Sequence, residues 1–118
     1  MAKTYAVVVG VVLLLVGILG FVTDQMFGLT FHPAHNVIHL LTGAIGLWAG
    51  FGKSANAPKL FAQVFGVVYT LVAIAGFAGM VDLGPIRLGL NTNYNVIHLV
   101  VGLWGLWAGF AKARAVTA

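Results

Sequence analysis

Two short stretches of this 118-residue sequence occur twice and decide how the chain is organised. Residues 36–40 read NVIHL and recur as NVIHL at residues 95–99, while residues 46–51 read GLWAGF and recur as GLWAGF at residues 105–110. Across the 17 aligned positions that contain both motifs, 12 are identical, and the shared residues include Asn, His and Trp. Shared hydrophobicity alone would not repeat those three residue types, so the pattern predicts a tandem duplication.

The match extends into the apolar segment that precedes each motif. At an offset of 56 residues, Lys3 aligns with Lys59, and the GVV of residues 10–12 aligns with the GVV of residues 66–68. Because the first segment has an internal counterpart, we expect it to be a structural helix rather than a cleaved signal peptide. We expect a single transmembrane domain over residues 1–118, with repeat one at 1–56 and repeat two at 57–118.

The composition excludes an ordinary soluble protein. Hydrophobic residues make up 61% of the chain and charged residues only 7%, against roughly 25% charged residues in soluble domains. The net charge of +4 comes from basic residues scattered singly at the ends of apolar runs, so no basic surface for nucleic acid is expected. The absence of cysteine excludes disulfides, thiolate metal sites and thiol catalysis. Membrane lipid is therefore the expected surrounding.

Four apolar segments have about the length that a helix needs to cross a bilayer. Lipid offers no partner to an unpaired backbone group, which favours helices. The fold class predicted is all-α, an integral membrane four-helix bundle made of two parallel, same-orientation two-helix repeats. The helices are expected at about 5–22, 34–52, 60–80 and 94–111.

The charges predict the orientation in the membrane. Basic residues gather on the side shared by both termini, namely Lys3, Lys53, Lys59, Lys112 and Arg114. The other side carries Asp24, Asp82 and Arg87. Lys and Arg favour cytoplasmic loops, so both termini are expected in the cytoplasm. Tyr5, Trp48 and Trp107 are expected at the interface on that same side.

A histidine and a stripe of glycines share one face of the second and the fourth helix. The stripe of the second helix is His39, Gly43, Gly46 and Gly50, with Asn36 one turn earlier. The stripe of the fourth is His98, Gly102, Gly105 and Gly109, with Asn95 one turn earlier. Small residues at this spacing favour close helix packing, with hydrogen bonds from Asn and His. The alternative is that His39 and His98 are axial ligands of haem b or of chlorophyll-type pigments, with the glycines leaving room for the ring.

A metal site is a further possibility that the repeat argues against. His35 and His39 are four residues apart on one helix face and could chelate a divalent ion, with His32 contributed by the loop. In repeat two, however, Tyr94 occupies the position of His35, and no carboxylate lies within a turn. The prediction from the sequence is that no metal is bound.

The motifs of common enzymes are missing, so we expect no catalytic residues. Asp24 and Asp82 fall in the two outer loops, where solvated turn residues are common. No nucleophile elbow, phosphate-binding loop or pair of carboxylates occurs. A transporter or channel would need a polar path, and the spans offer little beyond Thr42, Gln63, Tyr69 and Thr70.

The repeated motifs resemble those of a known family. The residues that carry the resemblance are Phe27-Gly28-Leu29 and then HNVIHL at 35–40, repeated as Leu88-Gly89-Leu90 and YNVIHL at 94–99. The chain resembles the bacterial membrane family described as domain of unknown function 4383 over nearly its whole length. The resemblance implies a four-helix bacterial inner-membrane protein in which Asn36, His39, Asn95 and His98 fit the family pattern, and it transfers no activity.

The sequence thus favours a non-catalytic accessory or structural subunit. It would pack against other membrane protein subunits or against copies of itself, because little of the chain lies outside the predicted spans. The alternative is a haem- or pigment-binding subunit that uses His39 and His98.

Overall fold

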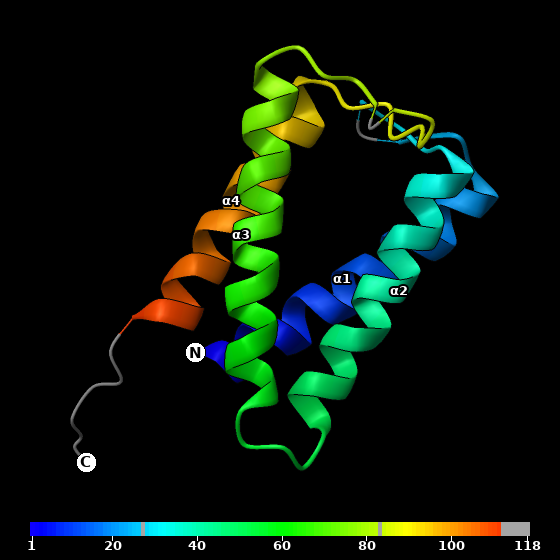
Figure 1. Ribbon diagram of the computed structural model, residues 1–118. Helices are drawn as coiled ribbons and strands as arrows, with labels where there is room; N and C mark the ends of the chain where they lie inside the picture. The colour runs from blue at the N-terminus through cyan, green and yellow to red at the C-terminus, as the bar shows by residue number, and fades with distance from the viewer. Residues whose placement is uncertain (27, 83, 112–118) are drawn as a thin grey trace.

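The computed structural model describes residues 1–26, 28–82 and 84–111. Most of these residues form four helices (Figure 1), which are α1 (Ala2–Val22), α2 (Pro33–Phe51), α3 (Ala57–Phe77) and α4 (Thr92–Phe110). The prediction of four helices in an all-α fold is confirmed, and every boundary lies within three residues of the expected one. Lys112 and Arg114, which contributed to the predicted orientation, lie outside the described residues, as does Phe27 of the family motif.

The helix ends follow local chemistry. Pro33 and Pro58 stand in the first turns of α2 and α3, where their missing N–H costs nothing. Helix α4 begins two residues earlier than expected because the side chain of Asn91 accepts a hydrogen bond from the N–H of Tyr94, at 3.0 Å. Helix α3 ends before residue 80 because Gly79 adopts a φ of 106°, which turns the chain out of the helix.

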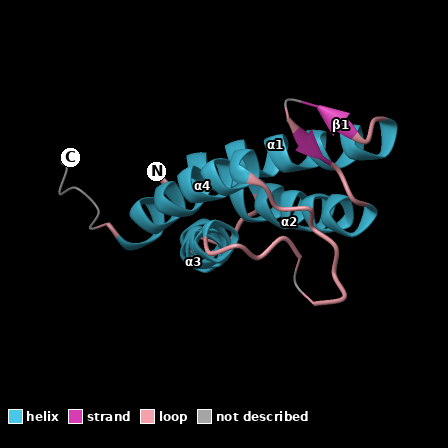
Figure 2. Ribbon diagram, turned by 90° about the horizontal axis from the view of Figure 1, so that it is seen from above, coloured by secondary structure: helices cyan, strands magenta, loops and turns pink. Residues whose placement is uncertain are grey.

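A small hairpin that the sequence pattern did not predict lies beyond the end of α1. Strand β1 (Gln25–Met26) pairs antiparallel with β2 (Leu29–Thr30), and Figure 2 shows the pair at one end of the helices. Together with the segment between α3 and α4, it covers that end of the molecule. A cluster of buried apolar side chains joins the two segments, namely Leu29, Phe31, Leu88, Leu90 and Tyr94.

The helices pack mainly in pairs, α1 with α2 and α3 with α4. Backbones approach closely within each pair: a Cβ added to Gly10 of α1 would lie 2.9 Å from the Leu47 nitrogen of α2. The aligned Gly66 of α3 is closer still, since its added Cβ would lie 2.5 Å from the Leu106 nitrogen of α4. Only glycine permits such contacts, so these positions set the spacing of the helices.

The two pairs meet in an apolar core built around Tyr5. This residue is completely buried, and its hydroxyl donates to the Val101 carbonyl of α4 at 3.0 Å. Its ring lies edge-on to Trp104, with the ring centroids 5.0 Å apart. The side chain of Tyr5 thus holds α1 to α4, and its position near the membrane interface stays a prediction. Trp48 and Trp107 are instead more than half exposed.

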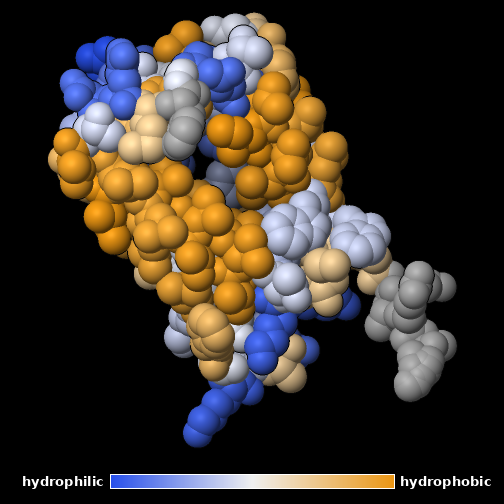
Figure 3. All heavy atoms as spheres, turned by 180° about the vertical axis from the view of Figure 1, so that it is seen from behind, coloured by the Kyte–Doolittle hydropathy of each residue, from blue (hydrophilic) through white to orange (hydrophobic). Residues whose placement is uncertain are grey.

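The face of the molecule that Figure 3 shows is strongly apolar along the helices. Each helix exposes large aliphatic side chains, for example Leu15 of α1, Leu41 of α2, Leu71 of α3 and Val100 of α4. Two of the helices, α1 and α3, are long and apolar enough by length and composition to cross a membrane. Helices α2 and α4 are less apolar, since each carries Asn and His residues. Four crossings therefore stay a prediction.

Candidate functional site

Three buried histidines converge between α2 and α4. His35 and His39 come from α2 and His98 from α4, and one nitrogen atom of each lies within 4.8 Å of those of the other two. None of the three side chains is more than 4% exposed. The two histidines that the sequence singled out thus lie in one cluster, and His35 joins them.

The cluster is held by ring contacts along and between the helices. One turn of α2 brings the His35 and His39 rings to a centroid distance of 4.2 Å, and His35 lies 5.8 Å from His98. Tyr94, one turn before His98, lies 4.7 Å from His35 and stacks on His98 at 5.6 Å. Tyr69 of α3 approaches His98 at 5.4 Å. Three helices therefore position the imidazoles.

The loop between α3 and α4 fixes the orientation of His35. Its Nδ1 lies 2.9 Å from the Leu88 carbonyl oxygen, and because a carbonyl can only accept, Nδ1 carries the proton and donates. The Nε2 atom of a neutral His35 then keeps its lone pair. Tyr94 is fixed in a similar way, since its hydroxyl donates to the Thr30 carbonyl at 3.0 Å.

Asp82 organises the loop that holds His35. Its carboxylate accepts hydrogen bonds from the N–H of Leu88 at 2.8 Å and from the N–H of Gly89 at 3.0 Å. The N–H groups of Gly89 and Leu88, with a smaller contribution from the Arg87 guanidinium, hold the pKa of the Asp82 carboxyl below its usual value. Asp82 was expected to be a solvated turn residue, but its two hydrogen bonds give it a structural role in this loop.

Several buried polar atoms in this region have no hydrogen-bond partner among the described residues. They include Nδ1 of His39 and Nδ1 of His98, as well as Oδ1 of Asn36 and of Asn95. An unmade hydrogen bond at a buried polar group costs about 1–3 kcal/mol. Two imidazoles in this state, side by side, indicate a place where a ligand can supply the missing interaction.

An apolar groove of about 460 Å³ opens beside the cluster, mostly between α1 and α4. Val9 and Leu13 of α1 and Val101 of α4 line it, and His39 and His98 contribute to its wall. Figure 3 shows the hydrophobic surface hollowed on this side of the molecule. The groove gives the cluster one route to the outside of the helices.

The glycine stripes face neighbouring helices of the same chain. Gly43, Gly46 and Gly50 lie against α1, and Gly102, Gly105 and Gly109 lie against α3. Asn36 packs on Gly20 and Asn95 packs on the aligned Gly76. The space that the tetrapyrrole hypothesis assigned to a ring on these stripes is thus filled by helix backbone.

Sequence reasoning missed Tyr94 and Asp82 as parts of this site and set His35 aside. The four-residue spacing of His35 and His39 was a usable signal, but the third histidine lies 59 residues after His39 and only the fold brings it near. His32, the remaining histidine, is not part of the cluster.

The chain belongs to the family described as domain of unknown function (DUF4383), whose model matches residues 3–111. No curated protein and no solved structure matches the chain.

Proposed function

We propose that this DUF4383 member is a non-catalytic integral membrane subunit of the bacterial inner membrane, and that all four of its helices cross the bilayer. Helices of 21 and 19 residues are about 31 and 28 Å long at a rise of 1.5 Å per residue. These lengths match a hydrocarbon core about 30 Å thick. The length of every helix therefore suits a crossing.

The observation that carries the proposal is the inward direction of the polar residues in α2 and α4. Asn36 and His39 of α2, and Asn95 and His98 of α4, are all at most 5% exposed. The side chains that these helices expose are large and apolar, such as Val100 at 62%. These four polar side chains would thus not touch lipid. Composition alone therefore understates how well α2 and α4 suit a bilayer.

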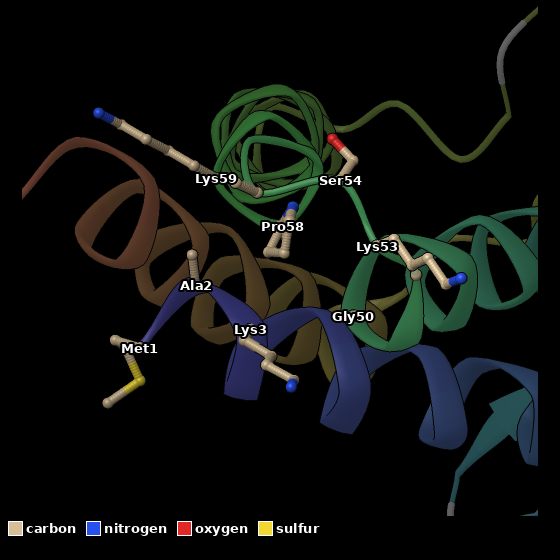
Figure 4. A pocket seen from close by; sticks show the side chains of 10 residues that line it. Met1, Ala2, Lys3, Gly50, Lys53, Ser54, Pro58 and Lys59 are labelled. Carbon is tan, nitrogen blue, oxygen red and sulfur yellow. The ribbon is translucent and has the colours of Figure 1, made fainter.

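The distribution of lysines supports cytoplasmic termini. Figure 4 shows Lys3 at the start of α1, Lys53 after α2 and Lys59 at the start of α3 around one end of the molecule. All three side chains are exposed there. This end would face the cytoplasm under the positive-inside rule. The end that carries Asp82 and the β hairpin would face outward.

The absence of native cysteine gives a direct test of the topology. Ser54→Cys and Pro85→Cys place single thiols in exposed loops at opposite ends of the helices, and Thr4→Cys provides a second thiol at the lysine end. A membrane-impermeant maleimide applied to intact cells should label only the thiol at position 85. The other two should react only after the membrane is opened. Labelling of positions 54 and 85 from the same side would refute four crossings.

The small share of the chain outside the helices supports the role of a subunit. The exposed apolar faces of the helices would contact lipid and either other membrane subunits or a second copy of the chain. Purification in a mild detergent followed by native electrophoresis tests this role. A species with the mass of one chain and no accompanying protein would count against it.

The alternative of a haem or pigment protein is favoured by the unpaired nitrogens of His39 and His98 beside the groove. An absorption spectrum of the purified protein decides it. A Soret band or red pigment bands that His39→Ala and His98→Ala reduce would support the alternative, and a colourless preparation would exclude it.

A further inference from the structure

We propose that His35, His39 and His98 together bind one transition-metal ion, either zinc or copper. The sequence argued against metal because repeat two has Tyr94 in place of His35. The fold removes that objection, because the third histidine comes from α4 rather than from a second copy of the same pair.

The separations suit a single ion. Two imidazole nitrogens bound to one zinc at 2.0–2.1 Å lie about 3.4 Å apart in a tetrahedron and at most about 4 Å apart. The three candidate nitrogens already lie within 4.8 Å of one another. The separations therefore need to shorten by at most about 1.4 Å, a change that rotation of the side chains can supply.

The donor set selects the class of ion. Three imidazoles with no carboxylate suit zinc, copper and similar first-row metals, whereas magnesium and calcium require oxygen ligands. Tyr94 is not offered as a fourth ligand, because its hydroxyl already donates to the Thr30 carbonyl. Three protein ligands leave a coordination position open. The groove that reaches His39 and His98 can supply water or a small ligand to that position.

The contacts around His35 resemble the outer shell that commonly supports a metal-binding histidine. Such a histidine donates its second ring N–H to a carbonyl or a carboxylate, which fixes the ring and makes the ligating nitrogen more basic. Here Nδ1 of His35 donates to the Leu88 carbonyl. The same peptide group donates its N–H, that of Gly89, to the Asp82 carboxylate. The carboxylate thus polarises the carbonyl that orients His35.

A metal ion suits the cluster better than helix packing alone or a tetrapyrrole does. Packing alone gives Nδ1 of His39 and Nδ1 of His98 no hydrogen-bond partner among the described residues. A tetrapyrrole between His39 and His98 would meet the His35 ring, which lies 4.2 Å from one of these rings and 5.8 Å from the other. A single ion needs only the space between the nitrogens.

The test uses the full chain in mild detergent, stripped with a chelator and titrated with cobalt chloride. Cobalt gives visible d–d bands that report coordination by nitrogen, and zinc, which has no such bands, should abolish them by competition. We expect one ion per chain. His39→Gln and His98→Gln should each lose the bands, while the matched control His32→Gln keeps them, because His32 lies outside the cluster. Circular dichroism confirms that each variant is folded.

Asp82→Asn provides a variant that keeps all three ligands. The loss of outer-shell partners of metal ligands commonly costs 10–100-fold in affinity, so we expect a fall of that size here. The proposal would be overturned if His39→Gln and His98→Gln both bound metal as tightly as wild type does. A haem bound by these histidines in the native protein would overturn it as well. Since the titration is made in detergent, its result is independent of the topology test above.

Discussion

Gly66→Ala should be among the most damaging single-methyl substitutions in the chain. A Cβ at this position would lie 2.5 Å from the Leu106 nitrogen and 2.6 Å from the Gly105 carbonyl carbon. Both neighbours are backbone atoms of α4, so no side chain can rotate away. Regaining an ordinary contact of 3.4 Å would require α3 and α4 to separate by about 0.9 Å. Overpacking of this kind typically costs about 1–3 kcal/mol, and we expect the upper part of that range.

The aligned position in repeat one supplies an internal comparison. A Cβ at Gly10 would lie 2.9 Å from the Leu47 nitrogen, so α1 and α2 would need to separate by only about 0.5 Å. Gly10→Ala should therefore destabilise the protein less than Gly66→Ala. Val67→Ala is the matched control, because Val67 is exposed on the outer face of α3. Unfolding in mixed micelles, followed by circular dichroism, measures all three. Equal midpoints for Gly66→Ala and wild type would refute the role given to close backbone contact.

Three further perturbations test other contacts, each by the same unfolding assay. Asn91→Ala removes the side chain that caps α4 at the Tyr94 N–H and should cost about 1 kcal/mol, so an unchanged midpoint would show that the cap is not needed. Tyr5→Phe removes the hydroxyl that donates to the Val101 carbonyl and should cost about 0.5–1.5 kcal/mol, with no loss of helicity in the folded state. Because folding lowers the pKa of Asp82, its carboxylate should stabilise the folded protein. This stabilisation is complete above the pKa of 3.8 in the unfolded chain and is lost as the pH falls towards the lower pKa in the folded protein. Asp82→Asn should lack that pH-dependent component, and identical acid profiles would contradict the assignment.

The four helices could be predicted because their signals are local. Apolar segments of sufficient length mark the helices, and Pro33 marks the start of α2 at the expected place. The error at the end of α3 has a local cause as well: the sequence does not reveal that Gly79 adopts a positive φ. The β hairpin was missed because two-residue strands are too short to show an alternating pattern.

The candidate site could be predicted only in part. Comparison of the repeats identified His39 and His98, because the same residue stands at matching positions. The same comparison argued against a role for His35, because the second half has Tyr94 at the matching position. The contacts of His35 with the Leu88 carbonyl and with His98 join segments 53 and 63 residues away along the chain. No local pattern in a single sequence reports such contacts.

The contact between His35 and the loop of the other half makes the two halves unequal partners. At the cluster positions, residues 1–56 contribute two histidines and residues 57–118 contribute one. A symmetric dimer of the first half would bring four imidazoles together, and a symmetric dimer of the second would bring two. An odd number of donors between two units requires that the units differ, so this cluster of three imidazoles has a stoichiometry that no symmetric pair of identical halves can have.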